Sequence, residues 1–186
     1  SRVRVVFSPR EPLLAIATLG PAPSAGAAWP PNRVLLWDVN SRQVVRELNV
    51  DGICNGLSFS EDGQTLVVGS GNSLTTAGEV SVWRVADGSK VASWAAGLTS
   101  TNTGSAWFAA TRDASAAAVG TSATTISVID LKTGRERWSA KTTDDALKCF
   151  AFSPDGRVLA SGAGFVDAVI RLWDATTGQP LGRLEG

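Results

Sequence analysis

The chain of 186 residues contains no histidine and no methionine, and its only cysteines are Cys54 and Cys149. Histidine is the commonest general base near neutral pH and a frequent zinc ligand, so its absence argues against histidine-based catalysis and against a Cys/His zinc site. At the two cysteines we expect small buried apolar side chains rather than a disulfide. Because the sequence lacks a start methionine, we expect it to be a piece of a longer protein.

An excess of charge of one sign and long apolar runs are also lacking. Lys plus Arg and Asp plus Glu number 17 each, so the net charge gives no reason to expect a nucleic acid or an anionic membrane as partner. No apolar run approaches the length that spans a bilayer, and no secretory signal pattern is visible. A content of 44% hydrophobic and 18% charged residues is typical of a globular domain with a sizeable core.

A sequence phrase near the C-terminus recurs three times upstream, each time with substitutions. Residues 152–156 read Phe-Ser-Pro-Asp-Gly, and residues 170–174 read Ile-Arg-Leu-Trp-Asp. The first part of the phrase recurs from Phe7, Phe59 and Ala110. The Trp position of the phrase falls at Trp37, Trp83, Ile129 and Trp173. The steps between Trp positions are therefore 46, 46 and 44 residues, a period typical of a stacked array of four-stranded units.

Each repeat contains short apolar or alternating segments separated by turn residues, which predicts β-strands. In the second repeat the expected strands cover roughly residues 54–60, 65–69, 79–85 and 90–94. The Asp-Gly dipeptides at 62–63 and 87–88 lie between them, and such dipeptides accept a positive φ in tight hairpins. No segment shows a sustained helical period, so we predict an all-β fold.

The spacing separates a constant hairpin from variable connections. From the Phe position to a glycine in the next segment the distance is 10 residues in three repeats, at 59–69, 110–120 and 152–162. From the Phe position to the Trp position it is 30, 24, 19 and 21 residues, and from there to the next Phe position 22, 27 and 23. The extra length therefore falls after the second strand, and again after the fourth strand at residues 97–105.

These repeats resemble those of the WD-repeat β-propeller family, over essentially all of the chain. In that family each blade is a four-stranded antiparallel sheet, and the blades stack around a central channel. The resemblance implies one β-propeller segment, 1–186, with four blades at approximately residues 1–50, 51–97, 98–143 and 144–186. It also implies that the constant hairpin lies on the lower face and that both variable connections open on the upper face.

The chain departs from the family in the hydrogen-bond network that joins a His, a Ser or Thr, an Asp and the Trp of a blade. Without histidine this network is incomplete in every blade, although Ser161, Asp167 and Trp173 match three of its four positions. We interpret Asp167 as a structural acceptor that ties its loop to the blade, rather than as a ligand contact. The repeat positions that we expect to be structural are Trp37, Asp38, Trp83, Ser161, Asp167, Trp173 and Asp174.

Blade number is a second departure, because members of the family more often have seven or eight blades. An open arc of four would expose the apolar faces of its first and last blades to water. Two explanations follow, and both can hold. A second copy completes an eight-bladed ring with two-fold symmetry, or the remaining blades lie elsewhere in a longer parent protein.

An enzyme needs convergent acid, base or nucleophilic groups, and the sequence offers few. The adjacent pair Asp144 and Asp145 precedes the fourth blade, where we expect a solvated loop rather than a catalytic dyad or a calcium site. The glycine-rich residues 69–73 lack the Lys-Ser or Lys-Thr and the helix of a phosphate-binding loop. We therefore predict no enzyme activity, no catalytic residue, no metal and no cofactor. A propeller enzyme is the third alternative, and it would need two acidic side chains within hydrogen-bonding reach at the channel mouth.

The variable connections are the candidate binding surface, and we predict a non-catalytic scaffold that binds a protein or a peptide there. Trp29 lies next to prolines in the insertion at 19–31, where it is either an aromatic anchor for a partner or a cover over the first two blades. The candidate partner-binding residues are Trp29, Asn72, Ser73, Asn102, Asp144, Asp145 and Phe165. The alternative function is structural: the main partner is a second copy, and the open blade faces form the contact.

Overall fold

The computed structural model describes residues 3–18, 32–72, 76–95, 108–121, 124–142, 147–164 and 169–185. Within these residues, sixteen strands form four antiparallel sheets of four strands each, and each sheet uses its strands in chain order. The prediction of an all-β fold with four four-stranded blades is therefore confirmed. We number the sheets blade 1 to blade 4.

Each blade is made of four strands that are consecutive in the chain. Blade 1 contains β1 (Arg4–Phe7), β2 (Leu13–Thr18), β3 (Asn32–Asp38) and β4 (Gln43–Val50). Blade 2 contains β5 (Ile53–Phe59), β6 (Thr65–Asn72), β7 (Thr76–Arg84) and β8 (Lys90–Ala95). Blade 3 contains β9 (Phe108–Ala110), β10 (Ala116–Gly120), β11 (Thr125–Asp130) and β12 (Glu136–Lys141). Blade 4 contains β13 (Leu147–Phe152), β14 (Val158–Ala163), β15 (Val169–Asp174) and β16 (Pro180–Glu185). In blade 2 the central strands are longer than expected, because pairing continues through the glycine-rich segment until Asn72 meets Thr76.

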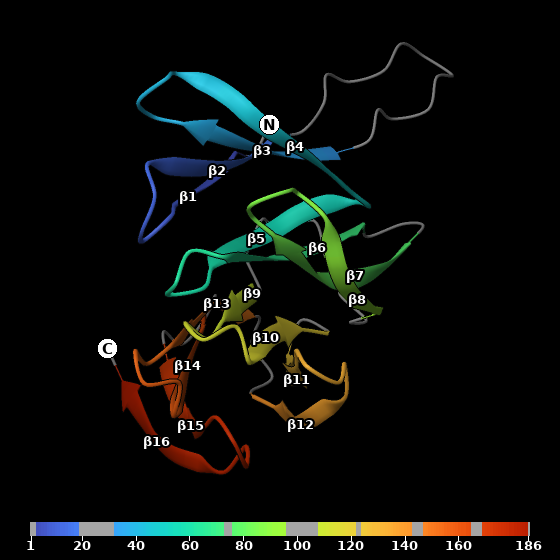
Figure 1. The fold of residues 1–186 in the computed structure, drawn as a ribbon. Coiled ribbons are helices and arrows are strands. Elements are labelled where there is room, and N and C mark those ends of the chain that lie inside the picture. The colour runs from blue at the N-terminus through green and yellow to red at the C-terminus, as the bar shows by residue number, and fades with distance from the viewer. Residues whose placement is uncertain are drawn as a thin grey trace.

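The four blades follow one another along an arc (Figure 1). The first strands of neighbouring blades adjoin, so that β1 contacts β5, β5 contacts β9 and β9 contacts β13. Blade 1, drawn in blue, and blade 4, drawn in orange and red, lie at opposite ends of this arc (Figure 1). Both end blades therefore keep one sheet face that no other blade of this chain covers.

Neighbouring blades pack face to face through apolar side chains. In the first junction, Leu36 and Leu48 of blade 1 share a buried cluster with Leu66 and Trp83 of blade 2. Two further clusters join blade 2 to blade 3 and blade 3 to blade 4. We call the face of a blade that meets the preceding blade its leading face, and the face that meets the following blade its trailing face. Because successive side chains of a strand point to opposite faces, each strand of an inner blade contributes to two junctions.

The aspartate at the end of the third strand organises the turn into the fourth strand. Asp38 accepts a hydrogen bond from the backbone N–H of Ser41, at 2.6 Å. In blade 4, Asp174 accepts from the backbone N–H groups of Thr176 and Thr177 at 2.9 and 2.8 Å. A carboxylate that satisfies turn donors in this way stabilises the turn locally. The repeated Trp-Asp phrase thus combines a packing residue with a turn residue.

The repeat tryptophans bind neighbouring groups through their indole N–H. Trp83 donates to Oγ of Ser81 at 2.9 Å, and Trp173 donates to Oγ of Ser161 at 2.9 Å. Both rings lie on leading faces and are buried. A hydroxyl partner lets a large aromatic ring enter the junction without leaving an unpaired N–H group. Asp167, the third member of the expected network in blade 4, lies outside the described residues.

The tryptophans of the fourth strands in blades 2 and 3 pack against a turn of the following blade. The ring of Trp94 lies against Gly134, and the ring of Trp138 lies against Gly178. Trp138 also donates its indole N–H to the backbone oxygen of Ala175 at 2.9 Å. Both glycines have φ of 72°, so the turn needs glycine for its backbone and for the close approach of the ring.

The two cysteines lie in different environments. Cys54 is half buried beside the first cluster, and burial raises the pKa of its thiol to about 12. Cys149 is exposed, which shows that the expectation of burial was wrong for this residue. It pairs with Gly162, whose Cα its sulfur covers, on the trailing face of blade 4. A following blade would bury this position, and the described chain ends at blade 4.

We predict that Gly134→Ala lowers the free energy of unfolding by about 2–5 kcal/mol, because a left-handed alanine costs roughly 1–2 kcal/mol and overpacking against Trp94 adds roughly 1–3 kcal/mol. Urea unfolding followed by tryptophan fluorescence measures the change. Gly182→Ala is the matched control, since a Cβ at Gly182 has no neighbour within 4 Å, and it should change stability by less than about 1 kcal/mol. Equal effects of the two substitutions would contradict the junction geometry.

We also predict an acid-sensitive contribution from Asp130. Hydrogen bonds from Arg137, at 2.8 Å for Nη2, and from Thr133 lower the pKa of Asp130 to about 2. A depressed carboxyl pKa stabilises the folded chain above the unfolded value near 4, and this stabilisation is lost as the pH falls from about 4 to about 2. Stability curves measured across this range should be flatter for Asp130→Asn than for the wild type, by roughly 1 kcal/mol after solvent screening. If the curves of Asp130→Asn and the wild type have the same slope, the hydrogen bonds of Asp130 do not contribute to the acid sensitivity.

Candidate functional site

The connections expected to bind a partner join strand ends at one end of the blades. They follow the second strands, at residues 19–31, 73–75, 121–124 and 164–168, and the fourth strands, at 51–52, 96–107 and 142–146. Of the candidate partner residues, Asn72 is the last residue of β6. The other candidates, Trp29, Ser73, Asn102, Asp144, Asp145 and Phe165, lie outside the described residues.

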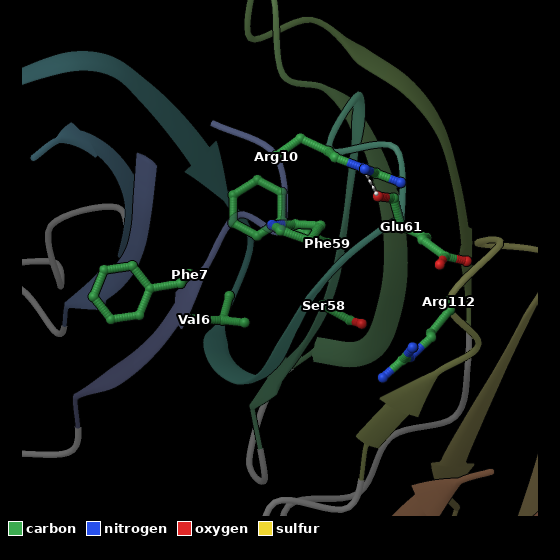
Figure 2. Close-up of a pocket in the computed structure, with 8 residues that line it drawn as sticks. Val6, Phe7, Arg10, Ser58, Phe59, Glu61 and Arg112 are labelled. Carbon is green, nitrogen blue, oxygen red and sulfur yellow. Dashed lines mark hydrogen bonds between the residues drawn. The ribbon is translucent and has the colours of Figure 1, made fainter. Parts of the chain in front are cut away.

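A cavity of about 580 Å³ opens at the other end of the blades, beside the turns that join first and second strands. Figure 2 shows its lining, which comes from three successive blades. The lining residues are Val6, Phe7, Pro9, Arg10, Ser58, Phe59, Glu61 and Arg112. The cavity therefore lies at the end of the blades that the family resemblance implies as the lower face. The connections predicted to bind a partner lie at the opposite end.

Backbone contacts between turns hold the charged rim of this cavity together. The N–H of Glu61 donates to the backbone oxygen of Arg112 at 2.6 Å. Nε of Arg10 donates to the backbone oxygen of Glu61 at 3.1 Å, beside the ring of Phe59 (Figure 2). Because these turns have the same length in each repeat, they bring residues from three blades to one rim.

The cavity combines an apolar floor with two guanidinium groups and one carboxylate. Such a lining is suited to a peptide segment that carries an acidic and an apolar side chain. Glu61 is the single carboxylate among its lining residues, so the cavity does not contain the acidic pair that the enzyme alternative requires. Sequence analysis missed this cavity. The sequence does contain one sign of the cavity: Glu61 and Arg112 are charged residues at the same position of two consecutive repeats.

The leading face of blade 1 is exposed at positions that are buried in the other blades. Phe7 is 67% exposed, whereas Phe59, at the same position in blade 2, is 7% exposed. Val39 is 43% exposed, whereas the equivalent Val85 is 6% exposed. The apolar residues of this face are Val5, Phe7, Leu14, Ile16, Leu35, Trp37 and Val39.

The trailing face of blade 4 shows the complementary pattern. Ile170 and Leu184, which lie opposite each other on β15 and β16, are 44% and 56% exposed. The equivalent residues of blade 1, Val34 and Leu48, are 0% and 1% exposed. Contiguous apolar surface of this kind marks an interaction surface rather than ordinary exposed residues. The expectation that an open arc exposes its two end faces is therefore confirmed.

The described residues show neither a metal-binding cluster nor a membrane-spanning helix. No group of three or more His, Cys, Asp or Glu side chains in the described ranges is placed to hold a metal ion. In the same part of the chain, no helix is long and apolar enough to cross a membrane.

Comparison with known proteins finds a family match for one part of the chain. A model of the family described as "WD domain, G-beta repeat" matches residues 137–174. The "Notchless protein homolog" of Arabidopsis thaliana is 54% identical over 37 residues, which cover 20% of this chain and 7% of that protein.

A solved structure, "Crystal Structure of Mitotic Checkpoint Complex", matches with a TM-score of 0.73 and 18% identity. The match covers 97% of this chain and 52% of the solved chain. The present chain therefore spans about half the length of this structural relative and a small part of the curated one. At this level of identity the structural match shows the fold alone.

Proposed function

We propose that this chain, a WD-repeat β-propeller segment, is a non-catalytic scaffold that binds a protein or a peptide through the connections on its upper face. One observation carries the proposal. At the lower end every blade uses the same short hairpin between its first two strands, whereas at the upper end the connections range from the two residues 51–52 to the thirteen residues 19–31. Surface connections that vary on a constant framework are where binding residues concentrate.

The upper-face contact residues that we propose are the candidates named from the sequence. Trp29 would provide a rigid apolar anchor, and aromatic anchors of this kind contribute much of the energy of protein interfaces. Asn72, Ser73 and Asn102 would supply adaptable hydrogen bonds, Asp144 and Asp145 would supply charge, and Phe165 would supply a second aromatic ring. The lower cavity is the competing site on the same molecule, which makes the choice between the two faces testable.

We predict that peptides selected from a phage-displayed random library against the wild-type chain lose at least tenfold in affinity for Trp29→Ala. The loss is expected because an anchoring indole is worth 2 kcal/mol or more at an interface centre. Fluorescence anisotropy of a labelled selected peptide gives the Kd, and urea unfolding checks that stability is unchanged. Arg112→Ala, on the rim of the lower cavity, is the control and should bind as the wild type does. If Arg112→Ala weakens binding and Trp29→Ala does not, the partner uses the lower cavity and the upper-face proposal fails.

A second function is favoured by a separate observation, the exposure of both end faces. In this function the chain is a half-propeller whose main partner is a second copy, and two copies form an eight-bladed ring. An apolar sheet face in water is unfavourable, at roughly 25 cal/mol for each Å² left uncovered. Two-fold symmetry would cover both end faces of both copies at once.

Multi-angle light scattering on a sizing column tests the second function. A half-propeller that pairs should elute at twice the chain mass of 19.3 kDa, because each copy then covers both of the other's open faces. A single species at the chain mass across micromolar concentrations would exclude pairing with a second copy. The upper-face proposal does not depend on this result.

A further inference from the structure

We infer that the lower cavity binds a peptide segment in which one carboxylate side chain stands next to an apolar side chain, and that Arg10 and Arg112 bind the carboxylate. This site lies at the end of the blades opposite the upper-face connections, so it is independent of the proposed function. Its residues come from the junctions of blades 1, 2 and 3. Phe7 also lines the cavity, but it stands on the open leading face of blade 1 and is left out of the proposed site.

The backbone of Glu61 connects three blades at the rim of the cavity. Its N–H donates to the backbone oxygen of Arg112 in blade 3 at 2.6 Å. Its carbonyl oxygen accepts a hydrogen bond from Nε of Arg10 in blade 1 at 3.1 Å. The repeat position of Glu61, two residues after the Phe position, is Pro9 in blade 1. Because proline has no backbone N–H, the side chain of Arg10 supplies at the first junction the donor that the backbone supplies at the second.

Packing also fixes the stem of Arg10. Its Cβ and Cγ lie 3.2 and 3.6 Å from a Cβ built at Gly63, in the neighbouring turn of blade 2. Of the five N–H groups of an arginine, the bond to Glu61 uses the one at Nε. The N–H groups at the two Nη atoms have no hydrogen-bond partner in the part of the chain that the structure describes. A guanidinium group positioned in this way loses little freedom when a ligand binds.

Arg112 supplies a second guanidinium group. Its backbone oxygen takes part in the rim, whereas its exposed side chain makes no hydrogen bond or ion pair with the described residues. The hydroxyl group of Ser58, on β5, lines the cavity as well. In the view of Figure 2, Arg10 and Arg112 lie on one side of the cavity and Val6 lies on the other. The cavity therefore presents cationic donors with free N–H groups across from an apolar wall.

The apolar wall suits one side chain of moderate size. Phe59 is buried and offers little area, so Val6 and Pro9 supply most of the apolar contact. Exposed ion pairs contribute little in water, and a carboxylate alone would therefore bind weakly. An apolar neighbour adds the burial of its own surface. The cavity volume of about 580 Å³ lies within the range of ligand sites, roughly 300–1,000 Å³, and accommodates both groups.

The charges of the lining favour a carboxylate over a phosphate group. Two guanidinium groups and the single carboxylate of Glu61 leave the lining with a net charge of 2 − 1 = +1. A carboxylate neutralises this charge, whereas a phosphate group of about −2 would leave excess negative charge beside Glu61. Asp62, in the same turn, accepts hydrogen bonds from Oγ of Ser60 and the N–H of Gln64 at 2.5 and 2.9 Å. Its charge adds to the repulsion of a dianion.

An NMR titration of the ¹⁵N-labelled chain tests the site. The probe is an end-blocked octapeptide with Leu-Asp at its centre and glycine and serine elsewhere. We expect the amide signals of Ser58, Glu61 and Arg112 to shift, and their concentration dependence gives the dissociation constant. A peptide with Asn in place of Asp should bind at least about tenfold more weakly, because charge-assisted hydrogen bonds are lost. A peptide with Ser in place of Leu should bind about fivefold more weakly or worse, because it buries less apolar surface.

Variants of the chain test the roles of the charged residues. Arg112→Gln should weaken binding of the Leu-Asp peptide at least about tenfold. Its fold should be unchanged, because the rim uses only the backbone of Arg112, and urea unfolding checks this. Glu61→Gln should strengthen binding by about threefold, because it removes a like charge and keeps both backbone bonds. Arg157→Gln is the matched control: Arg157 is an exposed arginine in the corresponding hairpin of blade 4, outside the cavity, and its loss should leave binding unchanged.

The outcomes separate this site from the upper-face proposal. If the Leu-Asp peptide shifts no signal of the cavity, or if Arg112→Gln binds it as the wild type does, the assignment fails while the upper-face proposal stands. Equal binding of the Asp and Asn peptides would show that the arginines do not bind a carboxylate. Tighter binding of a peptide with phosphoserine in place of Asp would overturn the preference for a carboxylate. Trp29→Ala should leave binding of the Leu-Asp peptide unchanged, and a loss of binding there would place this peptide on the upper face instead.

Discussion

The face-to-face contact between consecutive blades is the interaction on which the structure depends. One blade is a twisted sheet with apolar residues on both faces, and it cannot bury either face alone. In the three internal junctions, buried leucines, valines and tryptophans from two sheets close on one another. The end blades keep this two-sided pattern while only one of their faces is covered. The same sequence property that stabilises the arc therefore leaves two apolar faces that no other described blade covers.

The Trp-Asp phrase contributes both to a local turn and to the packing between blades. Asp174 satisfies the donors of its turn, and one residue earlier Trp173 enters the junction with blade 3, where its ring stacks on Trp138 at a centroid distance of 6.2 Å. The turn must keep its shape because the ring of Trp138 rests on Gly178 of the same turn. Turn shape and junction packing thus depend on each other in blades 2, 3 and 4, while the upper connections differ in length from blade to blade.

Sequence periodicity was sufficient to predict the sheets, because the Trp and Phe positions recur with the blade and the hairpin between them keeps its length. It did not show which face of its blade each side chain occupies. Cys149 was expected to be buried like Cys54 because both precede a Phe position, yet only Cys54 has a neighbouring blade over it. The rim of Arg10 with Glu61 depends on residues that the arc brings together from two blades.

The reactivity of Cys149 in the unmodified chain tests the central claim, that a second copy covers the open faces, most directly. Its alkylation by iodoacetamide can be followed by mass spectrometry while the protein concentration is raised, with Cys54 as the internal reference because burial raises its pKa to about 12. The account predicts that alkylation of Cys149 slows as the concentration passes through the dissociation constant for pairing, while Cys54 remains slow throughout. A rate at Cys149 that does not change while the copies pair would contradict it.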